Sequence, residues 1–138
     1  MEIVFLETIS LGDDINLDRF DELGHVTKYR DTPVELVPER VKDADVVVIN
    51  KIPMNEKTLA GASHLKLVAV TATGMDNIDR AYTDSRGILS ANVAGYSTEA
   101  VAQHTFALMF YVLHKLAYYD HYVKSGAYCT SAQFSHFE

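Results

Sequence analysis

The sequence predicts an α/β protein: a three-layer, flavodoxin-like domain with a five-stranded parallel sheet of strand order 2-1-3-4-5, followed by a long C-terminal helix. Short apolar runs alternate with amphipathic stretches over the first 92 residues. The run at residues 44–49 has no polar alternation, which is typical of a strand covered on both faces. After Asn92 the alternation stops, and a helical pattern continues to Lys124.

Each strand is expected where apolar residues cluster, and each helix where they recur at helical spacing. The predicted strands cover residues 3–7, 25–29, 44–49, 67–71 and 88–92, and the predicted helices cover residues 15–23, 34–42, 55–62 and 77–85. A parallel pair of strands needs a connection long enough to hold a helix, so this alternation predicts a parallel sheet with helices on both faces. Ligands of such a sheet bind at the carboxyl ends of the strands, near the point where the strand order reverses.

The residues support these elements to different degrees. The first strand has four consecutive apolar residues, and the helix after it has its apolar side at Ile15, Phe20 and Leu23. The second strand is weaker, whereas the third is a β-branched run. The third strand is therefore the clearest of the five.

The residues after 96 predict one long helix. Ser97 and Thr98 are good N-cap types, and Gly126 supplies a stop. Its apolar residues form two stripes, Val101, Leu108, Val112, Leu116 and Val123 in one, and Phe106, Met109, Phe110, Leu113 and Ala117 in the other. A helix that is apolar on two faces needs a partner on each, so we expect a homo-oligomer built on the stretch from Val101 to Val123. The expected parts are a sheet domain over residues 1–96, a crossover helix over 97–126 and a tail over 127–138.

Composition excludes several classes of protein. The chain has 138 residues, of which 48% are hydrophobic, enough for one packed domain. Its formal net charge is −7 without a cluster of Lys and Arg, so nucleic acid is not an expected partner. No apolar stretch is long enough to span a bilayer and no signal peptide is recognisable, so we expect a cytoplasmic protein with no membrane partner. The single Cys129 has no disulfide partner, and no residue set has the spacing of a metal site.

Residues 66–79, Lys-Leu-Val-Ala-Val-Thr-Ala-Thr-Gly-Met-Asp-Asn-Ile-Asp, are the most informative segment. A strand ends in small residues and a glycine, and acidic and amide side chains then open a helix. This arrangement exposes backbone N–H groups at the carboxyl edge of the sheet, where a carboxylate can be held, and Gly74 permits its close approach. The alternative is purely structural, with Gly74 in a tight turn and Asp76 as a helix cap.

A second segment follows at residues 87–104. It contains Asn-Val-Ala-Gly at 92–95, then Glu99 and the triplet Ala-Gln-His at 102–104. In their order and spacing the two segments resemble the D-isomer-specific 2-hydroxyacid dehydrogenase family, in which a Gly-x-Asp-Asn-Ile-Asp loop precedes Asn-Val-Pro/Ala-Gly and a helix with Glu and Ala-x-His. Ala94 stands where proline is common and Gln103 where Glu is usual. Gln103 and Tyr96 resemble the residues found at these positions in members that act on hydroxypyruvate or glycerate.

The resemblance implies roles for residues of this sequence. The substrate carboxylate would be held by backbone N–H groups of the loop after the fourth strand, formed by Ala72, Thr73, Gly74 and Met75. Lys51, in the loop after the third strand, would face the same carboxylate. The NAD cofactor would be bordered by Thr73, Asn92, Val101 and Thr105. For Lys51 the alternative is an ordinary solvated lysine. His104 is expected to pack or cap within the long helix and not to act in catalysis.

The groups that the family uses for hydride transfer are not found in these 138 residues. The dinucleotide fingerprint Gly-x-Gly-x-x-Gly does not occur. The resemblance places it, together with the catalytic Arg and the Glu/His pair, in a separate NAD-binding domain. The complete enzyme would reduce a 2-oxo acid to a D-2-hydroxy acid with NADH or NADPH. This chain alone would be a truncated, inactive half that has no catalytic residue and binds the cofactor weakly.

Two other classes of protein share this architecture. A phospho-receiver needs an acidic pair after the first strand, where the sequence has Glu7 and Thr8. A flavodoxin needs a phosphate-binding loop there, which residues 7–12 resemble only faintly, so the residues favour neither class. A third interpretation is an isolated folding or assembly domain that associates through the apolar helix.

Overall fold

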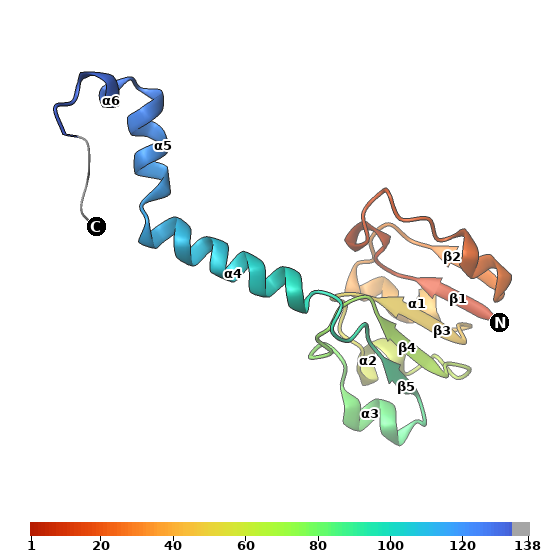
Figure 1. Ribbon diagram of the computed structural model, residues 1–138. Coiled ribbons are helices and arrows are strands. Elements are labelled where there is room, and N and C mark those ends of the chain that lie inside the picture. The colour runs from red at the N-terminus through yellow and green to blue at the C-terminus, as the bar shows by residue number, and fades with distance from the viewer. Residues whose placement is uncertain (134–138) are drawn as a thin grey trace. The chain divides into compact units, whose positions relative to one another are not determined.

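The computed structural model describes residues 1–133, and the chain divides into two compact units between Ala94 and Gly95. The first unit contains a sheet of five strands: β1 (Glu2–Phe5), β2 (His25–Lys28), β3 (Val46–Ile49), β4 (Leu67–Val70) and β5 (Leu89–Ala91). All neighbouring strands are parallel, and their order is β2-β1-β3-β4-β5 (Figure 1). The predicted fold class and strand order are therefore confirmed.

Three short α-helices cover one face of this sheet: α1 (Val37–Val41), α2 (Glu56–Leu59) and α3 (Arg80–Ser85). They enclose the larger core, in which Val47 and Val68 from neighbouring strands are completely buried. Val37 and Val41 of α1 and Leu59 of α2 pack into the same cluster. Right-handed crossovers from β2 through to β5 all run in one direction across the sheet, so their helices lie on one face.

The opposite face is covered less completely than predicted. The expected helix at residues 15–23 is instead one 3₁₀ helix, η2 (Asp18–Glu22), and a separate 3₁₀ helix, η1 (Thr8–Ser10), precedes it. The Asn16 side chain accepts a hydrogen bond from the Asp18 N–H at 2.7 Å, and such local bonds compete with an α-helix. Phe20 still packs edge-on against Phe5 with ring centroids 5.0 Å apart, so the segment closes a second, smaller core.

The other helices are shorter than the sequence predicts. The stretch 34–42 divides into η3 (Val34–Leu36) and α1, with Pro38 in the first turn of α1. In α2 the Asn55 side chain accepts hydrogen bonds from the N–H groups of Lys57 and Thr58, but the helix ends at Leu59. The stretch 77–85 becomes helical only at Arg80, because Asp79 is the N-cap.

The second unit, from Gly95 onward, corrects the prediction of one continuous helix. Its helices are α4 (Thr98–Leu113), α5 (Leu116–Lys124) and α6 (Ala127–Thr130). Lys115 between α4 and α5 has a left-handed backbone with φ of 49°, which interrupts the helical hydrogen bonds. The Ser97 N-cap position is as predicted, although its side chain makes no capping bond.

All side chains of α4 are exposed within this unit, including Val101, Phe106 and Phe110. Of the predicted tail, residues 134–138 lie outside the described part of the chain. None of the helices formed by residues 1–133 combines the length and apolar character that a bilayer crossing requires.

Candidate functional site

The candidate site is built from the three loops that follow β3, β4 and β5 at the carboxyl edge of the sheet. Backbone hydrogen bonds join the first two of these loops: Met54 N–H donates to the Asn77 carbonyl at 2.8 Å, and Asp79 N–H donates to the Met54 carbonyl at 2.8 Å. Met54 and Ile78 form a short parallel bridge. The two loops are therefore extended, paired segments and not independent turns.

Asn77 holds the first loop from one side. Its side-chain amide donates to the carbonyl oxygens of Ile52 at 2.8 Å and Asn50 at 3.3 Å. The segment after Gly74 is thus not yet helical, and Asp79, whose carboxylate accepts a hydrogen bond from Tyr82 N–H at 3.1 Å, is the cap. The alternative in which Asp76 caps the helix is wrong, which leaves its carboxylate exposed in the loop.

Asn92 and Val93 join the third loop to the second. The Asn92 side-chain amide donates to the Thr73 carbonyl at 2.6 Å, and the Val93 N–H donates to the Ala72 carbonyl at 3.1 Å. The Thr73 hydroxyl in turn donates to the Val93 carbonyl at 3.3 Å. The predicted site residues Ala72, Thr73 and Asn92 therefore lie together, in a loop whose carbonyl groups are occupied.

The N–H groups of this second loop are free. Among residues 1–133, no acceptor lies within hydrogen-bonding distance of the backbone N–H of Thr73, Gly74 or Met75. Thr73 and Gly74 are exposed and Met75 is half-buried. Backbone N–H groups that the protein leaves unpaired need water or a ligand, and consecutive ones form a concavity for an anion.

Gly74 has no structural need to be a glycine. Its backbone is outside the left-handed region, and an added Cβ would meet only the Asp76 Oδ2 atom at 3.7 Å, an ordinary contact. The tight-turn alternative therefore lacks support at this position. A side chain at this position would enter open space beside Asp76.

Lys51 lies beside this loop. It lines an open pocket of about 130 Å³ together with Gly74, Asp76 and Asn77. Its side chain is exposed, and no carboxylate among residues 1–133 forms an ion pair with its ammonium group. The structure thus places an unpaired positive charge and three unpaired N–H donors at one edge, an arrangement that suits a small carboxylate.

The predicted cofactor residues Val101 and Thr105 belong to the other compact unit, on α4. Val101 is 60% exposed, and the Thr105 hydroxyl donates to the Val101 carbonyl at 2.8 Å. Their role at the cofactor stays a prediction. His104 is exposed in the middle of α4 in the described chain, and its expected packing or capping role stays a prediction.

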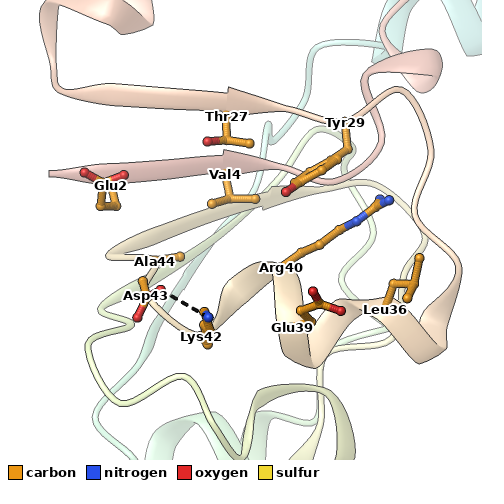
Figure 2. A pocket seen from close by; sticks show the side chains of 10 residues that line it. All are labelled: Glu2, Val4, Thr27, Tyr29, Leu36, Glu39, Arg40, Lys42, Asp43 and Ala44. Carbon is orange, nitrogen blue, oxygen red and sulfur yellow. Dashed lines mark ion pairs between the residues drawn. The ribbon is translucent and has the colours of Figure 1, made fainter.

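A larger pocket, of about 400 Å³, lies elsewhere, between β1, β2 and α1 (Figure 2). The Arg40 guanidinium lies 3.9 Å from the centroid of the Tyr29 ring and donates to the Asp31 carbonyl at 2.9 Å. Lys42 and Asp43 at its rim form an ion pair, drawn as the dashed line. Because its two cations, Arg40 and Lys42, are already engaged with the protein, this pocket does not compete as the carboxylate site. Residues 1–133 also contain no group of three His, Cys, Asp or Glu arranged to hold a metal ion.

One ionisable group with a shifted pKa lies at the opposite, amino edge of the sheet. The Asp45 carboxylate accepts a hydrogen bond from Lys66 Nζ at 2.8 Å and another from the Glu2 N–H at 2.9 Å. The lysine, more than the backbone, holds the pKa of Asp45 below its ordinary value of 3.8. This group contributes to the fold and not to the site.

The sequence profile of the D-isomer specific 2-hydroxyacid dehydrogenase catalytic domain matches residues 3–137. The chain belongs to this family. A glycerate dehydrogenase of Methylorubrum extorquens is 35% identical over 139 residues, covering 99% of this chain and 43% of the relative. A hydroxypyruvate reductase of Blautia hydrogenotrophica is 31% identical over 130 residues, covering 91% and 40%. The chain thus spans less than half the length of these 2-hydroxyacid dehydrogenases.

The fold agrees with that of solved family members. The D-lactate dehydrogenase of Aquifex aeolicus, solved with NAD and lactic acid, superposes with a TM-score of 0.74 at 23% identity, over 99% of this chain and 39% of that one. At this identity the likeness shows the fold alone.

Sequence reasoning missed two residues that shape this edge of the sheet, Asn77 and Glu7. Asn77 was assigned to a helix, although its place after the Gly-Met-Asp turn is a signal that an amide is available for loop carbonyls. One Glu7 carboxylate oxygen accepts hydrogen bonds from the N–H groups of Asn50, Lys51 and Ile52. Its position directly after the first strand, at the ligand-binding edge, was the available signal.

Proposed function

We propose that this chain is the substrate-binding half of an NAD(P)-dependent D-2-hydroxyacid dehydrogenase, which interconverts a 2-oxo acid and the corresponding D-2-hydroxy acid. The observation that carries the proposal is the set of unpaired N–H groups at Thr73, Gly74 and Met75 beside the unpaired ammonium of Lys51. Both acids carry a carboxylate, and such donors hold a carboxylate by charge-assisted hydrogen bonds. Family membership supplies the reaction class.

The role of these residues is to bind and orient the substrate. A carboxylate held by three backbone donors is fixed in position and direction, so the neighbouring carbon that reacts has a defined place. The Asn92 hydrogen bond to Thr73 keeps the donors in place, since it anchors the same loop through its carbonyl side. The substrate is proposed to be a small acid, hydroxypyruvate or glycerate, on the basis of the names of the two relatives.

The residues of the first unit do not fit a dinucleotide. A pyrophosphate needs free backbone N–H groups at a glycine-rich turn after the first strand. Here the connection carries the Glu7 carboxylate, which repels phosphate, and it has a single glycine, Gly12, before η2. We therefore infer that NAD(P) binding and the hydride and proton transfers depend on residues outside this chain.

The proposal is tested by titrating NADH with the purified chain, following cofactor fluorescence, next to a dehydrogenase assay with hydroxypyruvate, pyruvate and glyoxylate. The expected result is no saturable change in fluorescence and no turnover. Turnover, or NADH binding at micromolar concentrations, would contradict the assignment of this chain as the substrate-binding half alone.

The second unit is proposed to be an association surface in addition. Its exposed apolar side chains on α4 include Val101, Phe106, Phe110 and Leu113. Surfaces of this kind mark protein contacts, and a second copy of this chain is the proposed partner. A role as an isolated assembly domain is the alternative function that the same observation favours. A cytoplasmic location stays a prediction from the sequence.

A further inference from the structure

The Glu7 carboxylate is bound like a ligand by the loop after β3. Its Oε2 atom accepts hydrogen bonds from three consecutive backbone N–H groups, those of Asn50 and Lys51 at 2.8 Å and that of Ile52 at 3.0 Å. Hydrogen bonds from N–H groups to an ionised carboxylate are stronger than those to a neutral acceptor. Three donors on one oxygen are more than a surface glutamate needs.

The bonds from residues 50–52 to Glu7 lie at the point where the strand order of the sheet reverses. Glu7 follows β1, and the strand order reverses at β1, because β2 lies on one side of it and β3 on the other. In parallel sheets of this order the crevice between β1 and β3 is where an anionic ligand binds. In this chain the Glu7 carboxylate lies at this position and accepts hydrogen bonds from the N–H groups of residues 50–52, so these donors are already paired.

The loop that Glu7 binds also carries Lys51. Glu7 engages the N–H side of residues 50–52, and the Asn77 amide engages the carbonyls of Asn50 and Ile52. The backbone on both sides of Lys51 is thereby fixed, and its side chain lines the pocket with Gly74. The side chains of Glu7 and Asn77 do not bond to the N–H groups of residues 73–75. Any effect of these two side chains on the pocket therefore passes through residues 50–52.

We propose that Glu7 is a positioning residue, an internal anion that orders residues 50–52, fixes Lys51 beside the pocket and leaves Thr73, Gly74 and Met75 as the open anion cradle of this edge. The part that concerns substrate rests on the proposed function. The part that concerns loop order does not. It predicts that an external carboxylate of the right size replaces the Glu7 side chain when that side chain is removed.

The test uses ¹H–¹⁵N spectra and amide hydrogen exchange of the chain and three variants. In Glu7→Ala, the amides of residues 50–52 are expected to exchange about tenfold faster or more, as loss of bonds to a charged acceptor implies. Sodium formate is expected to reverse this change saturably, whereas sodium chloride at the same ionic strength does not. Glu35→Ala, which removes an exposed acid of η3, is the matched control and is expected to leave these amides unchanged.

Glu7→Gln keeps the shape and removes the charge. It is expected to show the faster exchange without a response to formate, because its amide still occupies the position of the Glu7 carboxylate beside residues 50–52. If Glu7→Ala folds only in formate, the internal anion is supported as well. Equal exchange at residues 50–52 in Glu7→Gln and the native chain, or no formate response in folded Glu7→Ala, would overturn the proposal. If Glu7→Ala is unfolded under all conditions, the Glu7→Gln exchange decides. Failure of the proposed function alone would leave the formate response intact.

Discussion

The side-chain amide of Asn92 donates a hydrogen bond of 2.6 Å to the backbone carbonyl of Thr73. This bond joins the end of β5 to the loop that follows β4. It occupies the carbonyl of a residue whose N–H group is unpaired, so it orients the peptide units of the loop without using their donors. The free N–H groups of the candidate site are thus held by hydrogen bonds made on the other side of the same backbone.

The Asn92 bond predicts a specific loss of stability. Asn92→Asp keeps the shape but has no donor, and it sets a carboxylate against a carbonyl, so we expect a loss of about 1–2 kcal/mol in the free energy of unfolding. Urea unfolding followed by circular dichroism measures this. Asn16→Asp is the control, because Asn16 acts only as an acceptor there and an aspartate accepts equally well. Equal stability of Asn92→Asp and the native chain would show that the bond is not made.

Lys51 is expected to strengthen carboxylate binding without contributing to the fold. Because it is exposed, its interaction with an anion is worth at most about 1 kcal/mol, so Lys51→Met should weaken pyruvate binding by up to about fivefold. The unfolding free energy should stay the same. Lys57→Met, an exposed lysine on α2, serves as control. An equal effect of Lys51→Met and Lys57→Met on pyruvate affinity would show that Lys51 is an ordinary solvated lysine without a role in carboxylate binding.

Gly74 separates binding from stability in the opposite way. Alanine fits its backbone and meets no close atom, so Gly74→Ala should keep or raise the free energy of unfolding, by up to about 1 kcal/mol. The added methyl group occupies space in the pocket that Gly74 lines with Lys51, so pyruvate binding should weaken. Gly61→Ala, at another position with open space, is the control for stability and should bind pyruvate normally. Normal pyruvate binding by Gly74→Ala would mean that the substrate does not approach this loop.

Asp45 predicts how stability depends on pH. Its pKa is depressed in the folded chain, chiefly by Lys66, so its contribution is fully present above the ordinary value of 3.8 and is lost as the pH falls through the depressed pKa. Asp45→Asn should therefore be less stable than the native chain at pH 7, and the difference should shrink below pH 3.8. Urea unfolding across this range measures it. Asp43→Asn, which removes an exposed acid 3.9 Å from Lys42, should show no such convergence.

The apolar side chains of α4 predict self-association. Light scattering on the purified chain is expected to give a mass above that of a monomer, rising with concentration. The double variant Phe106→Ser and Phe110→Ser removes two exposed rings and should shift the mass toward the monomer, whereas Gln103→Ser on the same helix should not. A monomer at high concentration in the native chain would remove the association surface from the account.

The sequence was sufficient for the sheet because its signals are local and strong. The run 44–49 and the spacing of five apolar segments are enough to define parallel strands, and the predicted order is the one common to flavodoxin-like sheets. The helices were less predictable. The side chains of Asn16 and Asp79 each accept a hydrogen bond from a backbone N–H group, and Lys115 has a left-handed backbone that its residue type does not predict. Propensity and spacing therefore predict longer helices than the chain forms.

The sequence predicts the loop at residues 72–75 but not the side chains of Asn77 and Glu7 that hold the neighbouring loop. The glycine and small residues at 72–75 indicate exposed N–H groups, and the structure confirms that these donors are free. Asn77 and Glu7 bind backbone atoms from a loop more than 20 residues away in the sequence. Such side chain to backbone bonds depend on which loops the fold brings together, which residue type alone does not reveal.

The most direct test of the carboxylate site is a titration of the ¹⁵N-labelled chain with sodium pyruvate, followed by ¹H–¹⁵N spectra. We expect saturable shifts of the amide signals of Thr73, Gly74, Met75 and Lys51, larger than those produced by sodium chloride at the same ionic strength. Signals of these four residues that move no more with pyruvate than with chloride would contradict the claim that this edge of the sheet holds the substrate carboxylate.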